Sequence, residues 1–248
     1  SSSLAELRKA TPRALVTAGK KTSAWFDPVV DGHVLPESPD TAFLAGRQND
    51  VPLLAGWTSA ETKWVKQSLS KFQAERDRLF PGHEQEAARL YPAANDAEAR
   101  RMAITMASDA WIVYRSWKWM ELHRKTGQSP VYRYLFDQVM NTPEGPVAAD
   151  DPGAAHATDI PFVFHALDYM GNPVSKSDTA TANLMMDYWA NFARDGDPNG
   201  PGLPAWPAYG IEEPFRIMRL KNGGAAEPES DRERMEFLDS LNTQPLDH

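Results

Sequence analysis

Short apolar runs alternate along the chain with longer stretches in which apolar residues recur every three or four positions. Residues 51–56 form a continuous apolar run that ends at Gly56, which is typical of a strand buried on both faces. Residues 131–136 are rich in β-branched and aromatic side chains, and residues 215–220 resemble them in part. The pattern therefore predicts three strands.

Helical spacing dominates the rest of the chain. It predicts short helices within residues 4–18, interrupted at Pro12, and longer helices at residues 71–80, 84–90, 97–124, 178–194 and 231–241. The core face of the longest one is predicted to hold Trp111, Trp117, Trp119 and Met120. Residues 137–156 are dense in Pro, Gly and Asp and predict a loop, and loops of that length are usually functional or mobile.

Helices that alternate with apolar strands indicate the α/β class, with a mostly parallel sheet flanked by helices. A parallel sheet needs both faces covered and its inner edges paired, and three strands are few for so much helix. We therefore expect residues 1–248 to be part of a single domain whose other strands lie outside this sequence.

Composition excludes several functions. The chain has 248 residues and a net charge of -8, without the Lys/Arg clusters that nucleic-acid binding needs. No apolar stretch approaches the length of a membrane span. Cysteine is absent, which excludes disulfides and thiolate chemistry, and no Asn-x-Ser/Thr acceptor occurs. These absences fit a bacterial or intracellular protein better than a secreted eukaryotic one, but the compartment stays open because the sequence begins at Ser1 without Met.

Two loops that follow predicted strands carry candidate chemistry. The first contains Glu61 and the second contains His156. Ligands of open α/β sheets bind beyond the carboxyl ends of the strands, where both loops would lie. A carboxylate that orients a histidine is the base half of a nucleophilic triad.

The same loops carry a specific resemblance to a known family. In chain order, the matching blocks are residues 30–36 (VDGHVLP) with 51–56 (VPLLAG), 153–164 (GAAHATDIPFVF), 187–194 (DYWANFAR), and 196–199 (GDPN) with 206–209 (WPAY). Together they resemble the type-B carboxylesterase/cholinesterase family of α/β-hydrolases, particularly its bacterial para-nitrobenzyl-esterase-like members.

The resemblance implies the C-terminal part of an α/β-hydrolase catalytic domain, acting on small-molecule esters without a cofactor or metal. By this match, Glu61 takes the place of the triad acid and His156 that of the catalytic base. Some of the helix at residues 97–124 would face the acyl or alcohol pocket.

The nucleophile is the main departure from the family pattern. The family's Gly-x-Ser-x-Gly elbow and Gly-rich oxyanion loop lie upstream of every matched block, and this sequence contains no such elbow. Ser59 lacks the flanking glycines and is a poor substitute. An N-terminal segment of the same enzyme is therefore the expected partner, supplying the serine and the oxyanion donors.

Less specific interpretations apply to neighbouring residues. Asp159 is expected to cap a short helix that starts at Ile160, with Pro161 in its first turn. Asp109 is interpreted as a structural cap, His33 and His165 as structural, and Trp57 as either pocket wall or packing. A metal site at Asp151, His156 and Asp159 is disfavoured, because no second histidine lies at ligand spacing.

Three alternatives to an intact esterase stay open. The chain could be one piece of a nicked enzyme, an inactive or non-catalytic binding and adhesion module of the same family, or an unrelated helical interaction protein.

Overall fold

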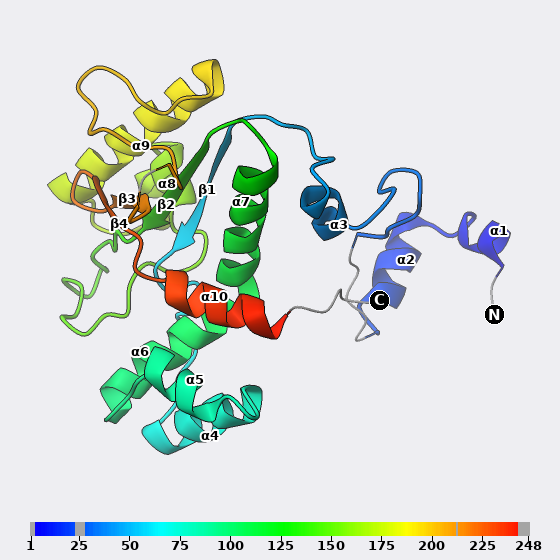
Figure 1. Cartoon of the computed structure of the whole chain (residues 1–248), viewed down its shortest axis with the longest axis horizontal. Coiled ribbons are helices and arrows are strands. Elements are labelled where there is room, and N and C mark those ends of the chain that lie inside the picture. The colour runs from blue at the N-terminus through cyan, green and yellow to red at the C-terminus, as the bar shows by residue number, and fades with distance from the viewer. Residues whose placement is uncertain (1–2, 23–27, 212, 243–248) are drawn as a thin grey trace. The chain divides into compact units, whose positions relative to one another are not determined.

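The computed structural model describes residues 3–22, 28–211 and 213–242 (Figure 1). The chain divides into two compact units, residues 1–42 and residues 43–248. The first unit contains α1 (Leu4–Leu7) and α2 (Pro12–Gly19), and α3 (Pro39–Leu44) runs across the boundary. Pro12 occupies the first turn of α2, where its missing N–H costs no helical hydrogen bond, so the predicted interruption is the start of a helix.

A four-stranded sheet organises the second unit. The strands lie in the order β1 (Leu53–Thr58), β2 (Val131–Phe136), β3 (Arg216–Leu220) and β4 (Ala225–Pro228). The first two pairings are parallel and the last is antiparallel. The prediction of a mostly parallel sheet is confirmed, and β4 is a strand that the sequence pattern did not predict.

Gly56 lies inside β1 and does not end it as predicted. The strand continues because Trp57 and Thr58 pair with β2. A Cβ at Gly56 would lie 2.2 Å from the backbone oxygen of Tyr134, so the close approach of the two strands depends on glycine at this position.

The connection from β1 to β2 is helical. It contains α4 (Leu69–Leu79), α5 (Glu84–Leu90), α6 (Asp96–Ser108), the π-helical turn η1 (Asp109–Val113) and α7 (Tyr114–Thr126). The predicted helix at 97–124 is therefore two α-helices joined by a π turn. A π turn adds one residue to the helical repeat and rotates the side chains that follow.

The predicted core face of this segment is wrong in part. Trp117 and Met120 are buried, as expected, but Trp111 and Trp119 are 44% and 42% exposed. Even in a regular helix Trp117 and Trp119 lie about 160° apart, so one face cannot hold all four side chains.

Between β2 and β3 the chain passes through a loop and three helices. Residues 137–159, all of which the structure describes, contain no helix or named strand, so the predicted loop is confirmed and extends slightly. It leads into α8 (Ile160–Val163), η2 (Leu167–Met170) and α9 (Lys176–Asp195). The last helix, α10 (Arg232–Leu241), follows β4.

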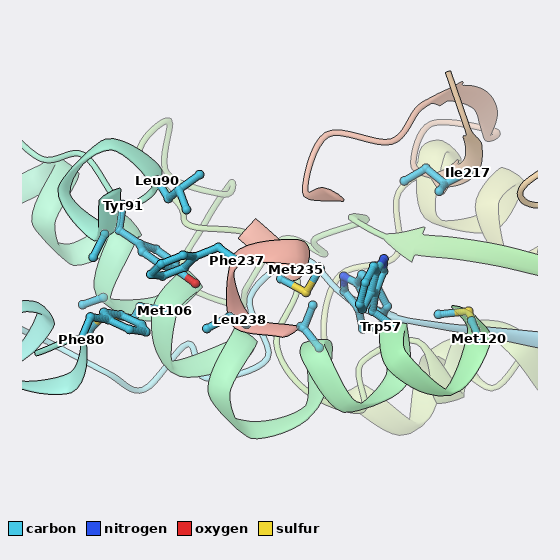
Figure 2. Close-up of a cluster of buried hydrophobic side chains, with 14 of the residues drawn as sticks. Trp57, Phe80, Leu90, Tyr91, Met106, Met120, Ile217, Met235, Phe237 and Leu238 are labelled. Atoms are coloured by element: carbon cyan, nitrogen blue, oxygen red, sulfur yellow. The ribbon is translucent and has the colours of Figure 1, made fainter. Parts of the chain in front are cut away.

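The two faces of the sheet bury separate apolar clusters. On one face Trp57 and Ile217 pack with α7, α10 and the helices before α7, and Figure 2 shows part of this cluster. On the other face Tyr132, Phe136 and Met218 pack with α8 and α9. Helices on both sides of a mostly parallel sheet confirm the predicted α/β class.

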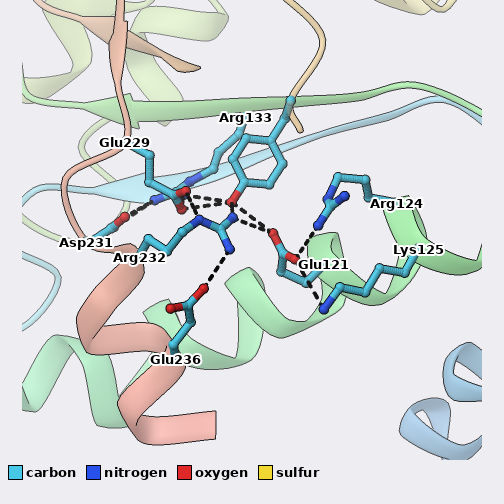
Figure 3. A network of polar contacts seen from close by, with 9 residues as sticks. Glu121, Arg124, Lys125, Arg133, Glu229, Asp231, Arg232 and Glu236 are labelled. Atoms are coloured by element: carbon cyan, nitrogen blue, oxygen red, sulfur yellow. Dashed lines mark hydrogen bonds and ion pairs between the residues drawn. The ribbon is translucent and has the colours of Figure 1, made fainter. Parts of the chain in front are cut away.

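A buried ionic network ties α10 to the sheet (Figure 3). The side chain of Arg133 on β2 is fully buried and donates to both carboxylate oxygens of Asp231 at 2.7 Å. Its guanidinium also pairs with Glu229 and lies 4.2 Å from the ring centroid of Trp57. Arg232 adds bonds to Glu229 and to Glu121 on α7.

Among the described helices, none is long and apolar enough to cross a membrane.

Candidate active site

Glu61 lies three residues beyond the end of β1, with only 3% of its side chain exposed. Its Oε1 accepts a hydrogen bond from the backbone N–H of Thr58 at 2.7 Å. This bond fixes one carboxylate oxygen and directs the other, Oε2, toward the loop that follows β2.

His156 meets that second oxygen. Its Nδ1 lies 2.5 Å from Oε2 of Glu61. Because a carboxylate can only accept, Nδ1 carries the hydrogen in this bond, and Nε2 is the nitrogen left for proton transfer. The imidazole is 43% exposed, in contrast to the enclosed carboxylate. The structure thus brings together the two residues predicted as acid and base.

Backbone pairing holds the two loops side by side. The N–H of Ala60 donates to the carbonyl of Ala154 at 2.8 Å, and Ala60 and Ala155 form a parallel bridge that continues the β1–β2 pairing beyond the strands. Glu61 and His156 therefore project from neighbouring positions beyond the carboxyl ends of β1 and β2.

Ser59 reinforces this junction. Its Oγ donates to Asp137 at 2.6 Å and accepts from the N–H of Ala154 at 2.9 Å. A Cβ at Gly153 would lie 2.3 Å from that oxygen, and Gly153 has a φ of +127°. The hydroxyl of Ser59 thus joins the two loops, which agrees with its rejection as a nucleophile.

Lys63 also stabilises the loop that carries His156. Its ammonium donates to both oxygens of Asp151 at 2.7 and 2.9 Å and to the carbonyl of Gly153 at 2.8 Å. Asp151 in turn accepts from the N–H of Gly153 at 2.9 Å. Neither Lys63 nor Asp151 was predicted to have this role, and only their proximity to Glu61 and His156 in the sequence pointed to it.

An exposed tryptophan completes the surroundings of the histidine. The ring of Trp111 lies 4.8 Å from the imidazole of His156, centroid to centroid, with a tilt of 57°. Sequence reasoning placed this residue in the core, because its contact with His156 depends on how two distant segments pack.

Asp159 does not cap α8 as expected. It occupies the N-cap position with Pro161 in the first turn, but its side chain makes no capping bond and instead accepts from the hydroxyl of Tyr134 at 3.0 Å. Burial raises the pKa of Tyr134 well above its usual value, and the neighbouring Asp159 and Glu61 raise it further. Tyr134 is therefore a neutral hydrogen-bond donor beneath the site.

The remaining candidates have structural surroundings. His165 bonds to Asn183 at 2.8 Å, and the backbone N–H of His33 donates to Asp31. Trp57 is buried beneath Arg133, so of its two predicted roles the structure favours packing and not lining a pocket. Asp109 occupies the C-cap position of α6, and its buried side chain bonds to Tyr91 and Arg234. Within the described residues, no cluster of His, Asp or Glu could hold a metal ion.

Comparison with known proteins gives a consistent result. The chain matches the carboxylesterase family over residues 1–238. Carboxylesterase 4A of Bos taurus is 30% identical over 222 residues, which make up 79% of this chain and 39% of that protein. The medium-chain fatty acyl-CoA hydrolase precursor of Anas platyrhynchos is 28% identical over 237 residues, or 87% of this chain and 42% of that protein.

A third relative, the cocaine esterase of Homo sapiens, is 26% identical over 215 residues, covering 78% of this chain and 38% of that protein. The chain thus spans about two fifths of the length of these relatives.

Proposed function

This chain belongs to the carboxylesterase family, and we propose that it contributes the histidine and the acid of a serine esterase that hydrolyses small-molecule carboxylic esters. Its mostly parallel sheet with helices on both faces fits the α/β-hydrolase fold of that family. The proposed site consists of His156 as base and Glu61 as acid.

The contact between these two side chains carries the proposal. Glu61 is enclosed and held by the N–H of Thr58, so it presents one oxygen in a fixed direction. That oxygen lies 2.5 Å from Nδ1 of His156, which selects the tautomer with the hydrogen on Nδ1. A carboxylate in this position stabilises the imidazolium that forms when Nε2 accepts a proton.

Because Nδ1 of His156 is bonded to Glu61, Nε2 is the nitrogen that transfers protons in the proposed ester hydrolysis. Nε2 of His156 accepts the proton of a serine hydroxyl as its oxygen attacks the ester carbonyl carbon, and a tetrahedral intermediate forms. The imidazolium then donates that proton to the leaving alcohol, and the bond to the alcohol oxygen breaks to give an acyl-enzyme. In the second half Nε2 accepts a proton from water as the water oxygen attacks the acyl carbon. The imidazolium then donates that proton to the serine oxygen, whose bond to the acyl carbon breaks, and the carboxylic acid is released.

The proposal includes a partner segment. The nucleophilic serine and the oxyanion donors would come from an N-terminal segment of the same enzyme. Two observations support this: the sequence holds no Gly-x-Ser-x-Gly elbow, and the chain matches about two fifths of each relative described above. The exposed imidazole of His156 is the surface to which that serine would be presented.

The test is the replacement His156→Ala in the full-length protein, assayed with an activated ester such as a nitrophenyl ester. We expect a loss of about 10³-fold or more in kcat, because acylation and deacylation both need the base. His165→Ala is the matched control, since this exposed histidine nearby bonds to Asn183 and not to Glu61. Near-wild-type hydrolysis by His156→Ala would rule out the assigned base. A full-length protein that hydrolyses no ester would support a non-catalytic binding module instead.

A further inference from the structure

Trp111 lies against the imidazole of His156 at an irregularity in the helix. It lies in η1, the π turn between α6 and α7, and its ring centroid is 4.8 Å from that of the imidazole. Its side chain is 44% exposed and contacts the histidine loop through this ring pair. π turns in helices occur frequently at functional sites.

Two neighbours hold this turn in place. Asp109, which begins the turn, is buried and accepts from Tyr91 at 3.0 Å and from Arg234 at 3.0 Å. On the solvent side, the ring of Trp64 lies 5.5 Å from that of Trp111, edge to face at 71°. Trp111 therefore contacts both the exposed Trp64 and the imidazole, and these two contacts restrict its orientation.

We propose that Trp111 is a positioning residue for His156, holding the imidazole toward Glu61 and stabilising its protonated form through contact with the indole ring. This inference rests on the proposed function. An indole attracts a cation that lies near its ring, so the contact strengthens when the imidazole gains a proton. The contact with Glu61 fixes one nitrogen of the ring, and the contact with Trp111 restricts its rotation about that bond.

Apart from Glu61, the charged groups near His156 are paired with other residues. Glu61 contacts the imidazole directly, Lys63 is paired with Asp151, and Asp159 accepts from the neutral hydroxyl of Tyr134. A substitution at Trp111 leaves all of these unchanged. Any shift of the pH profile that such a variant causes therefore reports on the indole itself.

The sign of that shift follows from the contact. If the indole stabilises the imidazolium, its removal makes the imidazole lose its proton at lower pH. The acidic limb of the profile of kcat/KM against pH then moves to lower pH. Loss of the same stabilisation in the transition state lowers kcat/KM on the plateau by about 3- to 30-fold.

The experiment compares three variants of the full-length protein, Trp111→Leu, Trp111→Phe and Trp119→Leu, with an activated ester. Trp119 is the matched control, because it is equally exposed on the adjoining helix α7 and packs against Phe43, not His156. We expect Trp111→Leu to lower kcat/KM and shift the acidic limb, Trp111→Phe to recover most of both, and Trp119→Leu to change neither. An acidic limb that Trp111→Leu leaves in place would overturn the proposal.

Tryptophan fluorescence tests the contact without relying on hydrolysis. A protonated imidazole quenches an indole that it touches, so wild-type fluorescence should fall as the pH is lowered and the imidazole gains a proton. Trp111→Phe and His156→Asn should each remove that component. A fluorescence change that persists in Trp111→Phe contradicts the contact. A change that both variants remove, in a protein without esterase activity, would mean that the proposed function fails while the contact stands.

Discussion

Glu61 and His156 differ sharply in their exposure to water, and this difference divides their roles. The carboxylate is 3% exposed and the imidazole 43%. An enclosed carboxylate with one oxygen fixed by a backbone N–H cannot reorient, so it acts through geometry and charge on its partner. The exposed ring nitrogen is the part of the pair that can reach a reacting group.

Replacing the acid by its amide should separate charge from shape. We predict that Glu61→Gln lowers kcat by about 10³- to 10⁴-fold, because the amide favours the wrong imidazole tautomer and no longer stabilises the imidazolium. Glu144→Gln, on an exposed part of the loop at residues 137–159, is the control. Steady-state hydrolysis of an activated ester measures both, and a decrease smaller than tenfold would count against Glu61 as the acid.

The buried carboxyl of Asp109 should make the stability of the fold depend on pH. Burial raises its pKa from 3.8 to about 6, although Arg234 and Tyr91 oppose the shift. A carboxyl whose pKa is higher in the folded protein binds its proton more tightly there. Ionisation of Asp109 therefore lowers the free energy of unfolding by about 2 to 3 kcal/mol as the pH rises from about 4 to about 6.

Asp109→Asn should remove this dependence on pH. The free energy of unfolding of the variant, relative to wild type, should rise by that amount between pH 4 and pH 7, as measured by urea denaturation at several pH values. Asp31→Asn, at an exposed carboxyl, provides the comparison. A constant difference between Asp109→Asn and wild type across this range would contradict the prediction.

Sequence reasoning selected Glu61 and His156 because each lies on a loop after a predicted strand and in a block that resembles the family pattern, and the structure places the two side chains in contact. It missed the role of Trp111 and the bond from Tyr134 to Asp159, since both depend on how distant segments pack. It also predicted from local sequence that Asp159 caps α8, whereas the carboxylate of Asp159 accepts a hydrogen bond from the distant Tyr134.

At the scale of elements, the strands and helices that carry strong patterns were predictable and the irregular ones were not. Residues 225–228 (AAEP) contain no β-branched or aromatic residue, so β4 had no signal; antiparallel pairing with β3 forms it. The end of β1 was misplaced because Gly56 was interpreted as a stop, while its close contact with Tyr134 gives glycine a place inside the strand.

That contact leads to a prediction for the pairing of β1 with β2. Gly56→Ala should lower the free energy of unfolding by about 1 to 3 kcal/mol or more, because the new Cβ has no space against the backbone of Tyr134. Gly82→Ala is a useful control, since its Cβ would meet nothing within 4 Å and only the positive φ opposes it. Equal urea midpoints for Gly56→Ala and wild type would contradict the close approach.

The attachment of α10 to the sheet depends on Arg133. We predict that Arg133→Met costs about 3 to 5 kcal/mol of stability, because Asp231 and Glu229 would be left buried without their partner. Arg194→Met, which removes only an exposed pair with Asp195, should change stability by about 1 kcal/mol or less. Thermal and urea unfolding would measure both, and similar losses for the two variants would contradict the assigned importance of the network.

At the scale of the whole molecule, β1 occupies the end of the sheet order. Among the described residues its outer edge therefore pairs with no named strand. Apolar side chains are also exposed beside the site, including Ile160 and Phe164. An unpaired edge and exposed apolar side chains are the features that a further segment of the same domain would cover.

We therefore predict that residues 1–248 expressed alone are poorly soluble and inactive, and that co-expression with the proposed N-terminal segment restores both properties. Solubility, size-exclusion chromatography and ester hydrolysis would be measured on both preparations. If the isolated chain were a soluble monomer that unfolds cooperatively, this would count heavily against the shared-domain proposal.

The bridge between Ala60 and Ala155 has an evolutionary consequence. It fixes Glu61 and His156 through neighbouring strands, so the number of residues that connect them does not enter their geometry. The helices from α4 to α7 leave the sheet at β1 and return at β2. Insertions and deletions in the turns of this helical connection can therefore accumulate without separating Glu61 from His156, so the surroundings of the pair can change while its geometry stays the same.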